Sequence, residues 1–290
     1  MVIRKISYYR VIVSLCLFMF LLSPVFGDEI SAVSFDKELP ENNIVTIQPD
    51  SLRILHNPLT GWVLYASMGV DAADFWAQYD HMYIPELGHN VSVTDYAHTL
   101  YIRASWTDFN PQEDVYGWKI DSNLRAYIEG AYQRNMRLAF RVVVDSRDKR
   151  TEFTPQFVKD AGAKGFMNKG KWSPYSDDPV FQKYYTKFVK ALAKDFNDPS
   201  KVEFIDGFGL GKWGEYHTMI YSTGDDTPKK AVFNWVTDIY SQAFDKVPVV
   251  INYHRWIGAG KDWVDDEHFA ADSEEMLEEA IKKGYSLRHD

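Results

Sequence analysis

The chain has 290 residues, of which 46% are hydrophobic and 16% aromatic, and its formal net charge is -9 at pH 7. This length fits one large domain. A chain this acidic repels phosphate backbones and anionic lipid faces, so we expect neither nucleic-acid nor membrane-surface partners. The many aromatic side chains instead suit stacking on the flat apolar faces of a ligand.

Residues 1–27 are typical of a secretory signal peptide. They combine a basic start without acids, the short apolar run VIVSLCLFMFLL and a small residue, Gly27, before Asp28. The run is shorter than the roughly 20 residues of a membrane span, although an uncleaved anchor is the alternative. Cys16, the only cysteine, lies in this segment, so we expect no disulfides in the mature chain. The sequence thus predicts an exported bacterial protein, periplasmic or extracellular.

Residues 28–60 show little periodicity and are predicted to form a lead-in. Beyond them, β-type apolar runs alternate with amphipathic helical patterns. The predicted strands are 61–66, 99–106, 137–145, 202–210, 247–254 and a last one from 285 onward. The predicted helices carry apolar stripes over 124–132, 181–196 and 232–244, and a fourth, with acids early and lysines late, covers 272–284. Asp178 and Pro179 mark the start of the second helix.

Regular alternation of strands and helices predicts a parallel sheet. Six such strands fit either an open doubly wound sheet or a (β/α)8 TIM barrel. The doubly wound form is favoured by a glycine-rich phosphate turn after the first strand, and the sequence has none. Polar and aromatic residues recur at the carboxyl ends of the strands, where barrel active sites lie. We therefore predict an α/β fold in which residues 61–290 supply about six of the eight units of a TIM barrel, with the remaining units beyond Asp290.

The segment GFGLGKWGEYHT, residues 207–218, places Glu215 among aromatic residues and glycines. A carboxyl group held against indole and phenol rings is partly desolvated, which favours the protonated form that can donate to a leaving oxygen. The glycines would let the backbone turn tightly and approach a ligand. In the alternative interpretation, Glu215 is a solvated loop acid and the glycines serve only barrel packing.

The other candidate residues would line the same rim and bind substrate. Arg103 lies in an apolar strand and is expected to point into the barrel and pair with an acid, either structurally or beside a ligand. Asp145 ends a strand, where substrate contact and helix capping are both open. No H-E-x-x-H pattern is present, so we expect no metal and no cofactor. The predicted substrate-binding residues are Arg103, Trp106, Asp145, Trp213, Tyr216, His217, Tyr253, His254 and Trp256.

Two segments resemble clan A glycoside hydrolases, particularly the family 42 β-galactosidase type. In IRASWTDFNPQEDVYGWKID, residues 102–121, the resemblance rests on the matching pieces Arg103, Trp106, Pro111, EDVYGW and Ile120-Asp121. GLGKWGEYH, residues 209–217, resembles the fourth-strand segment that carries the acid/base, which assigns that role to Glu215. A closer resemblance is to uncharacterised secreted bacterial barrels with an NP-L-x-G opening, here residues 57–61, and a GLGxWGEWH-type motif; the ending YSLRHD also fits them.

Two positions depart from the clan pattern. The clan usually has asparagine directly before the acid/base, contacting the sugar 2-hydroxyl, and Gly214 stands there. Asn110 stands where glutamate commonly precedes the proline. The resemblance further implies a nucleophile from the seventh strand, which would lie beyond Asp290.

The sequence thus predicts a secreted glycoside hydrolase that cleaves O-glycosidic bonds of an oligo- or polysaccharide, with Glu215 as general acid/base. One alternative is a barrel that binds glycans without cleaving them, which Gly214 and the missing second carboxylate would suit. Another alternative is an inactive truncated fragment with an open sheet edge.

Overall fold

The structure is a computed structural model that describes residues 62–66, 68–145, 152–168, 170–252 and 272–288. The chain divides into two units, Met1–Arg53 and Ile54–Asp290, and all described residues belong to the second. Several sequence predictions therefore lie outside the described residues: the signal peptide, the lead-in, and the candidate site residues Tyr253, His254 and Trp256.

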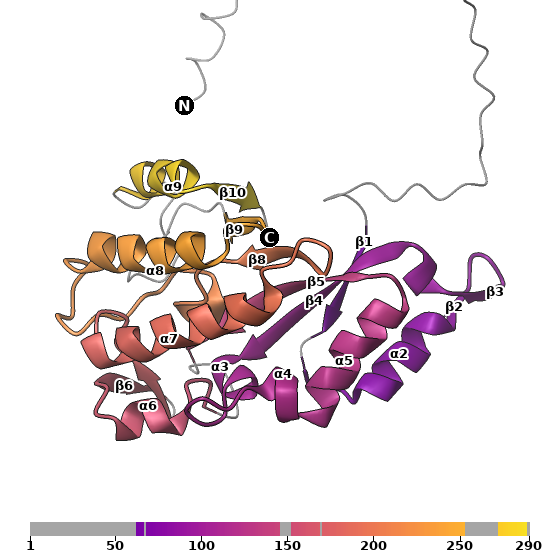
Figure 1. The fold of residues 1–290 in the computed structure, drawn as a ribbon, viewed down its shortest axis with the longest axis horizontal. Coiled ribbons are helices and arrows are strands. Elements are labelled where there is room, and N and C mark those ends of the chain that lie inside the picture. The colour runs from indigo at the N-terminus through magenta and orange to yellow at the C-terminus, as the bar shows by residue number, and fades with distance from the viewer. Residues whose placement is uncertain (1–61, 67, 146–151, 169, 253–271, 289–290) are drawn as a thin grey trace, which may run out of the picture. The chain divides into compact units, whose positions relative to one another are not determined.

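The fold is built on one six-stranded sheet in which each strand pairs in parallel with the next. The spatial order is β1 (Trp62–Ala66), β4 (Ala97–Ser105), β5 (Arg137–Val143), β8 (Val202–Asp206), β9 (Val249–Asn252) and β10 (Tyr285–Arg288) (Figure 1). The prediction of an α/β fold with six parallel strands is confirmed. The strands follow chain order without the reversal that defines a doubly wound sheet. Over the described ranges, β1 and β10 are not paired, so the sheet is open between them.

Helices connect the strands and succeed one another along the sheet in chain order (Figure 1). The aspartate cap predicted at Asp178 is confirmed, because Asp178 Oδ1 accepts from Phe181 N at 2.8 Å. Asp121 caps α5 in the same way, with its Oδ1 accepting from Leu124 N at 2.7 Å. None of the helices within the described ranges is long and apolar enough to cross a membrane. The main helices are α2 (Ala72–Asp80), α5 (Ser122–Gln133), α7 (Pro179–Phe196), α8 (Lys229–Ala243) and α9 (Ser273–Lys282).

The two faces of the sheet differ in chemistry because side chains alternate along each strand. One face is apolar and packs into a buried core with the helices; its strand residues include Leu100, Ile102, Leu138, Phe140, Ile205 and Ile251. The intervening positions carry polar groups, and the register sets several of them side by side: Tyr65 with Tyr101, Arg103 with Arg141, and Asn252 with Arg288. The candidate site is built on this polar face.

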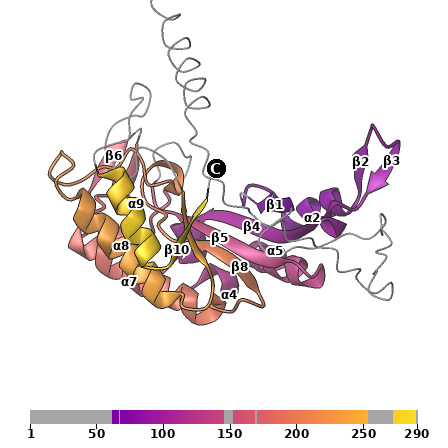
Figure 2. The ribbon, with the colours of Figure 1, turned by 90° about the horizontal axis from the view of Figure 1, so that it is seen from above.

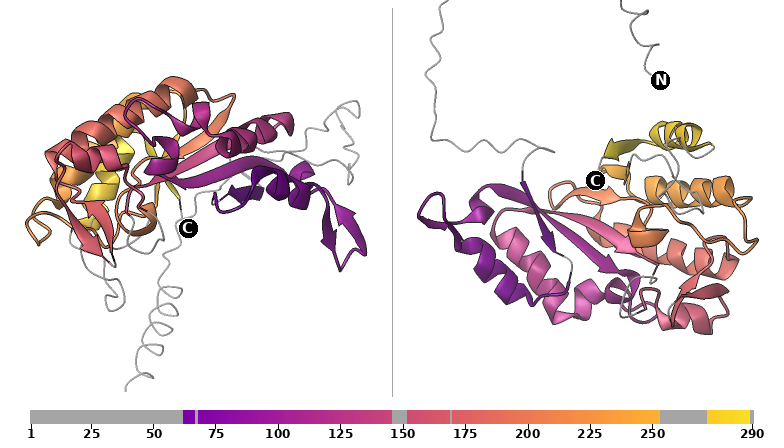
Figure 3. Two further views of the ribbon diagram at one scale, coloured as in Figure 1. Left: turned by 90° about the horizontal axis from the view of Figure 1, so that it is seen from below. Right: turned by 180° about the vertical axis from the view of Figure 1, so that it is seen from behind.

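Short elements in the connections were not predicted, because they are too short to show a period in sequence. The hairpin of β2 (Met82–Ile84) and β3 (His89–Val91) projects beside α2 (Figures 2 and 3). A second hairpin joins β6 (Gly165–Asn168) to β7 (Lys171–Pro174). The remaining short elements are η2 (Val93–Asp95), α3 (Trp106–Phe109), α4 (Gly117–Ile120), α6 (Gln156–Asp160) and η3 (Lys212–Gly214).

Candidate functional site

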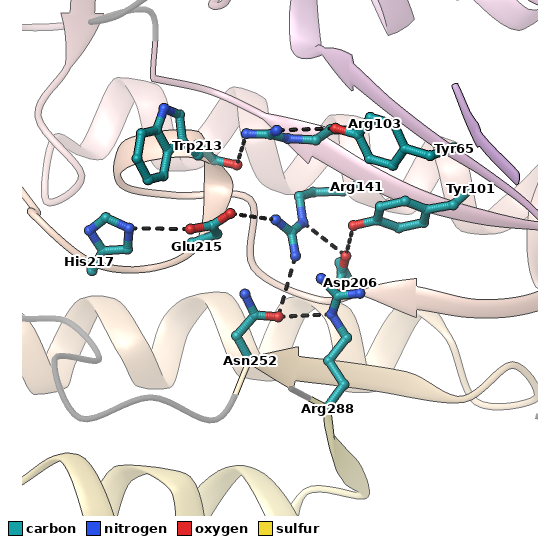
Figure 4. A network of polar contacts seen from close by, with 10 residues as sticks. All are labelled: Tyr65, Tyr101, Arg103, Arg141, Asp206, Trp213, Glu215, His217, Asn252 and Arg288. Atoms are coloured by element: carbon teal, nitrogen blue, oxygen red, sulfur yellow. Dashed lines mark hydrogen bonds and ion pairs between the residues drawn. The ribbon is translucent and has the colours of Figure 1, made fainter. Parts of the chain in front are cut away.

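The guanidinium of Arg141 is the centre of the polar face. Arg141, on β5, is 2% exposed. Its Nε donates to Asp206 Oδ2 at 2.9 Å, and its Nη1 donates to Glu215 Oε1 at 3.1 Å (Figure 4). Its Nη2 donates to Asn252 Oδ1 at 3.3 Å. One side chain therefore links β8, β9 and the loop that carries the candidate proton-transfer group.

Asp206 is a buried carboxylate, 1% exposed, whose charge is balanced on both oxygens. Besides Arg141, it has Arg288 Nε at 3.0 Å from its Oδ1 and accepts a hydrogen bond from the Tyr101 hydroxyl. Burial, with the nearby Asp206 charge adding to it, raises the pKa of Tyr101 well above its usual range. The phenol therefore keeps its proton and remains a donor, and these partners offset the cost of burying the carboxylate.

The loop of residues 207–218 turns sharply through left-handed backbone conformations. Gly209 and Gly211 each have φ of 72°. A Cβ atom on Gly209 would lie 2.2 Å from the Val142 carbonyl oxygen, and one on Gly211 would lie 2.6 Å from that of His217. Only glycine fits such an approach. The loop also holds Trp213 and Tyr216 at φ of 59° and 60°, conformations that are strained for residues with a Cβ and that concentrate at functional sites.

The surroundings of Glu215 differ from the expectation of an apolar pocket. Its side chain is 22% exposed, and Oε1 accepts from Arg141. Oε2 lies 3.3 Å from Nε2 of His217, whose Nδ1 lies 2.8 Å from Thr218 Oγ1. The carboxyl was expected to lie against indole and phenol rings, but its contacts are to Arg141 and His217, and the ring of Tyr216 packs in the core. A guanidinium at this distance favours the ionised carboxylate.

Arg103 lies on β4 beside Arg141, as predicted, but its partners differ from the expectation. Nη2 donates to the Trp213 carbonyl oxygen at 2.8 Å, and Nη1 donates to the Tyr65 hydroxyl at 3.1 Å. The expected pairing with an acid is not found among the described residues, where both acceptors are neutral. The buried ion pair expected of Arg103 is made instead by Arg141.

Two aromatic candidates belong to the core. Trp106, 0% exposed, begins α3 and packs among core aromatics, with its ring centroid 5.2 Å from that of Tyr185. Tyr216, also 0% exposed, packs against Phe208 and Phe233. A ring without exposed surface cannot stack on a sugar, so the expectation of a substrate contact is corrected for both.

Three further candidates remain near the polar face or at a strand end. Trp213 is partly exposed, with its ring 5.7 Å from that of His217. His217 is buried and holds Glu215 rather than facing solvent. Asp145, after β5, has its Oδ1 3.4 Å from Ser173 Oγ on β7, so this contact fixes the β6–β7 hairpin to the end of β5.

Sequence reasoning missed most of the network because it considered strand ends rather than strand interiors. The available signal was a charged residue at an alternating position of an otherwise apolar strand, as in RLAFRVV and VEFID. The residues missed are Tyr65, Tyr101, Arg141, Asp206, Asn252 and Arg288.

The backbone explains glycine at the position before Glu215. Gly214 has φ of 74°, and a Cβ there would lie 3.3 Å from Val143 Cγ2 and 3.5 Å from Arg141 Cδ. A side chain at this position would therefore adopt a backbone conformation that favours glycine and would meet Val143 closely, whereas its contact with Arg141 would be an ordinary one.

Two cavities lie away from this network, at the amino ends of the strands. One of about 470 Å³ is lined by residues including Ala97, Arg134 and Arg137, and one of about 480 Å³ by residues including Val249 and Ser286. Across the described part of the chain, no group of three His, Cys, Asp or Glu side chains is arranged to hold a metal.

No protein-family model matches the sequence, and no curated protein matches it significantly. Among solved structures, xylanase B from Clostridium stercorarium F9 is similar at 13% identity over 78% of this chain and 59% of that one, with a TM-score of 0.43. Endo-glycoceramidase II from a Rhodococcus species is similar at 13% identity over 74% of this chain and 56% of that one, with a TM-score of 0.41. An exo-β-1,4-mannosidase from an Opitutaceae bacterium is similar at 14% identity over 66% of this chain and 31% of that one, with a TM-score of 0.40. The chain spans less than two thirds of each, and a likeness at this level does not identify what the chain does.

Proposed function

We propose that this protein is a glycoside hydrolase in which Glu215 transfers the proton. The observation that carries the proposal is a partly exposed carboxylate on a strained loop after β8, held through Oε1 by Arg141. Loops at the carboxyl ends of parallel strands are where enzymes of barrel type place their reacting groups. The motifs in residues 102–121 and 209–217 support the same assignment.

The two carboxylate oxygens of Glu215 have different partners, and we assign them different roles. Oε1 is engaged by Arg141, which fixes the orientation of the group. Oε2 faces His217 Nε2 at 3.3 Å and is the oxygen that can exchange a proton. In this proposal Glu215 binds a proton at Oε2, gives it to the leaving glycosidic oxygen, and then accepts one from the incoming water.

A second carboxylate is needed for this reaction. Asp206 does not suit the role, because it is buried and ion-paired with both Arg141 and Arg288. We propose that the second carboxylate lies outside the described residues, on strands that complete a TIM barrel between β1 and β10. We also propose that residues 1–27 direct export, so that the substrate is an extracellular or periplasmic oligo- or polysaccharide.

The test compares Glu215→Gln with a matched control, Glu129→Gln, on a panel of aryl glycosides and polysaccharides. Glu129 is an exposed glutamate on α5 that pairs with Arg125. Loss of proton transfer at Glu215 should lower kcat by at least about 100-fold, whereas the control should keep the wild-type rate. Glu215→Gln activity within about threefold of wild type would refute the assignment.

A non-catalytic glycan-binding protein is the second candidate. Two observations favour it: the guanidinium contact that favours ionised Glu215, and Gly214 at the position where the clan contacts the sugar. Wild-type protein that binds oligosaccharides but releases no reducing sugar from any of them would establish this alternative.

A further inference from the structure

Two glycines at the start of the loop of residues 207–218 leave room for tyrosine hydroxyl groups. A Cβ atom on Gly207 would lie 2.8 Å from the hydroxyl oxygen of Tyr285, and one on Gly209 would lie 2.5 Å from that of Tyr185. Glycine permits such an approach because it has no Cβ atom. The two glycines therefore let both hydroxyl groups reach the backbone of this loop.

Each of the two hydroxyl groups donates a hydrogen bond to a carbonyl oxygen where the chain leaves β8. Tyr285, on β10, donates to the Gly207 carbonyl oxygen at 2.7 Å. Tyr185, on α7, donates to the Phe208 carbonyl oxygen at 3.1 Å. Successive peptide groups of the loop are thus held by side chains from two other elements of the fold.

A second phenol orients the hydroxyl group of Tyr185. Its oxygen lies 2.9 Å from that of Tyr240 on α8. A hydroxyl group has one proton, and because Tyr185 gives its proton to the Phe208 carbonyl, Tyr240 donates to Tyr185. Tyr185 and Tyr240 are 0% exposed, and Tyr285 is 4% exposed. A carbonyl group left without a donor at this depth is costly, so these hydrogen bonds strongly favour the observed path of the chain.

The part of the loop that carries Glu215 is closed on itself. Tyr216 N donates to the Leu210 carbonyl oxygen at 2.9 Å, so the residues between them form one unit. The direction in which this unit leaves the sheet is set at Gly209, which has φ of 72° and directly follows the two carbonyl groups held by the tyrosines.

We propose that Tyr185 and Tyr285 are positioning residues for Glu215. By holding two successive carbonyl groups after β8, they make the chain turn at Gly209 and bring Glu215 to the guanidinium of Arg141. Both side chains belong to the apolar core, so they act on the loop from the helix side of the sheet. This inference rests on the proposed function in that it names residues that position the same proton-transfer group.

The test begins with Tyr185→Phe and Tyr285→Phe, each of which removes one hydroxyl group and keeps the ring. The matched control is Tyr127→Phe on α5, because this buried tyrosine donates to the Val70 carbonyl oxygen at 3.0 Å in a different loop. Hydrogen exchange of the full chain, followed by mass spectrometry, compares peptides from residues 207–218 with peptides from β5.

Exchange in the loop should be at least about fivefold faster in both variants than in the wild type, as expected for the loss of a buried hydrogen bond. Exchange in β5 should change by less than about twofold, which separates a loosened loop from a general loss of stability. Tyr127→Phe should leave both regions unchanged. Equal acceleration in the loop and in β5, or no acceleration of the loop in either variant, would overturn the inference.

The wild type decides the question if neither variant folds. Its loop amides should exchange at least about 100-fold more slowly than the amides of an unstructured peptide, because the backbone hydrogen bonds of the loop are held in place. Exchange at the rate of an unstructured peptide would show that the loop is not held, and the inference would be lost.

Activity then links the loop to the reaction. On the aryl glycoside that the wild type cleaves fastest, Tyr185→Phe should lower kcat by at least about tenfold and leave KM within about threefold, because a misplaced reacting group slows the chemistry more than binding. In the Glu215→Gln background, the same substitution should change kcat by less than about twofold, since it acts through Glu215. A full additive loss in that background would contradict the positioning role.

The inference and the proposed function fail separately. Faster loop exchange in both variants, together with a wild type that cleaves no glycoside, refutes the proposed function and leaves the control of the loop by the tyrosines intact. Hydrolysis that depends on Glu215, with kcat of both variants within about threefold of wild type, refutes this inference alone.

Discussion

Arg141 Nη1 lies 3.1 Å from Glu215 Oε1, which ties the candidate proton-transfer group to the interior of the sheet. The same guanidinium binds Asp206 through Nε. The position of Glu215 therefore depends on a buried ion pair as well as on its own loop. This relationship makes the site and the stability of the fold experimentally coupled.

Arg141→Gln should lower the free energy of unfolding by about 3 kcal/mol, because removal of one partner leaves the buried charge of Asp206 poorly compensated. Urea denaturation followed by circular dichroism measures this loss. Arg125→Gln is the control, since its exposed pair with Glu129 on α5 should contribute less than about 1 kcal/mol. A loss no larger than that of the control would contradict a structural role for the network.

Gly209→Ala should be far more destabilising than Gly88→Ala. Both glycines have a positive φ, of 72° and 69°, so the backbone strain is shared. Only at Gly209 would the new Cβ collide with a neighbouring atom, the Val142 carbonyl oxygen at 2.2 Å, whereas nothing lies within 4 Å at Gly88. We expect about 1 kcal/mol for Gly88→Ala and at least about 2 kcal/mol more for Gly209→Ala. Equal losses in thermal or urea unfolding would exclude the close approach.

Alkaline pH should unfold the protein cooperatively. Burial, with the Asp198 charge adding, raises the pKa of Tyr132 to about 12, and burial raises the pKa values of Tyr101, Tyr185, Tyr216 and Tyr285 well above the usual range. Because an unfolded tyrosine ionises near pH 10, the stabilisation is complete below about pH 10 and falls as pH rises toward the folded pKa values.

Tyrosinate absorbance at 295 nm and far-ultraviolet circular dichroism would measure this together. The tyrosinate absorbance of the buried tyrosines should rise in one step, at the same pH at which secondary structure is lost. Full ionisation of all tyrosines around pH 10 with the fold intact would show that these phenols are accessible.

The ion pair between Asp80 and Arg134 should contribute stability only above acid pH. Hydrogen bonding from Arg134 lowers the pKa of Asp80 below its ordinary value of 3.8. A carboxyl group whose pKa is lower in the folded state stabilises the protein at pH values above its unfolded pKa. This stabilisation is lost as pH falls through the folded pKa. Asp80→Asn should therefore be less stable than wild type at pH 7, and the difference should shrink below about pH 4.

Urea unfolding between pH 2 and 7 tests this, with Asp74→Asn as the control on the exposed surface of the same helix. A difference between wild type and Asp80→Asn that stays constant over this range would rule out the linkage.

The sequence by itself determined the six strands, the helices α5, α7, α8 and α9 and the tight loop before Glu215, whereas the nine-residue helix α2 was not predicted. These features are local: periodicity shows in a few turns, caps such as Asp178 act on residues three positions away, and glycine marks left-handed backbone. The alternation of elements predicts parallel strands, whereas their pairing in chain order is a finding of the structure.

Tertiary structure alone decided which groups surround Glu215. Arg141 meets Asp206 and Asn252 across 65 and 111 residues of sequence, and those contacts depend on the register between strands. The same holds for Trp106: it follows directly after a strand, but α3 begins there and turns the ring into the core. Periodicity shows that a side chain lies on one face of a strand, but only the packed sheet brings particular charges within bonding distance.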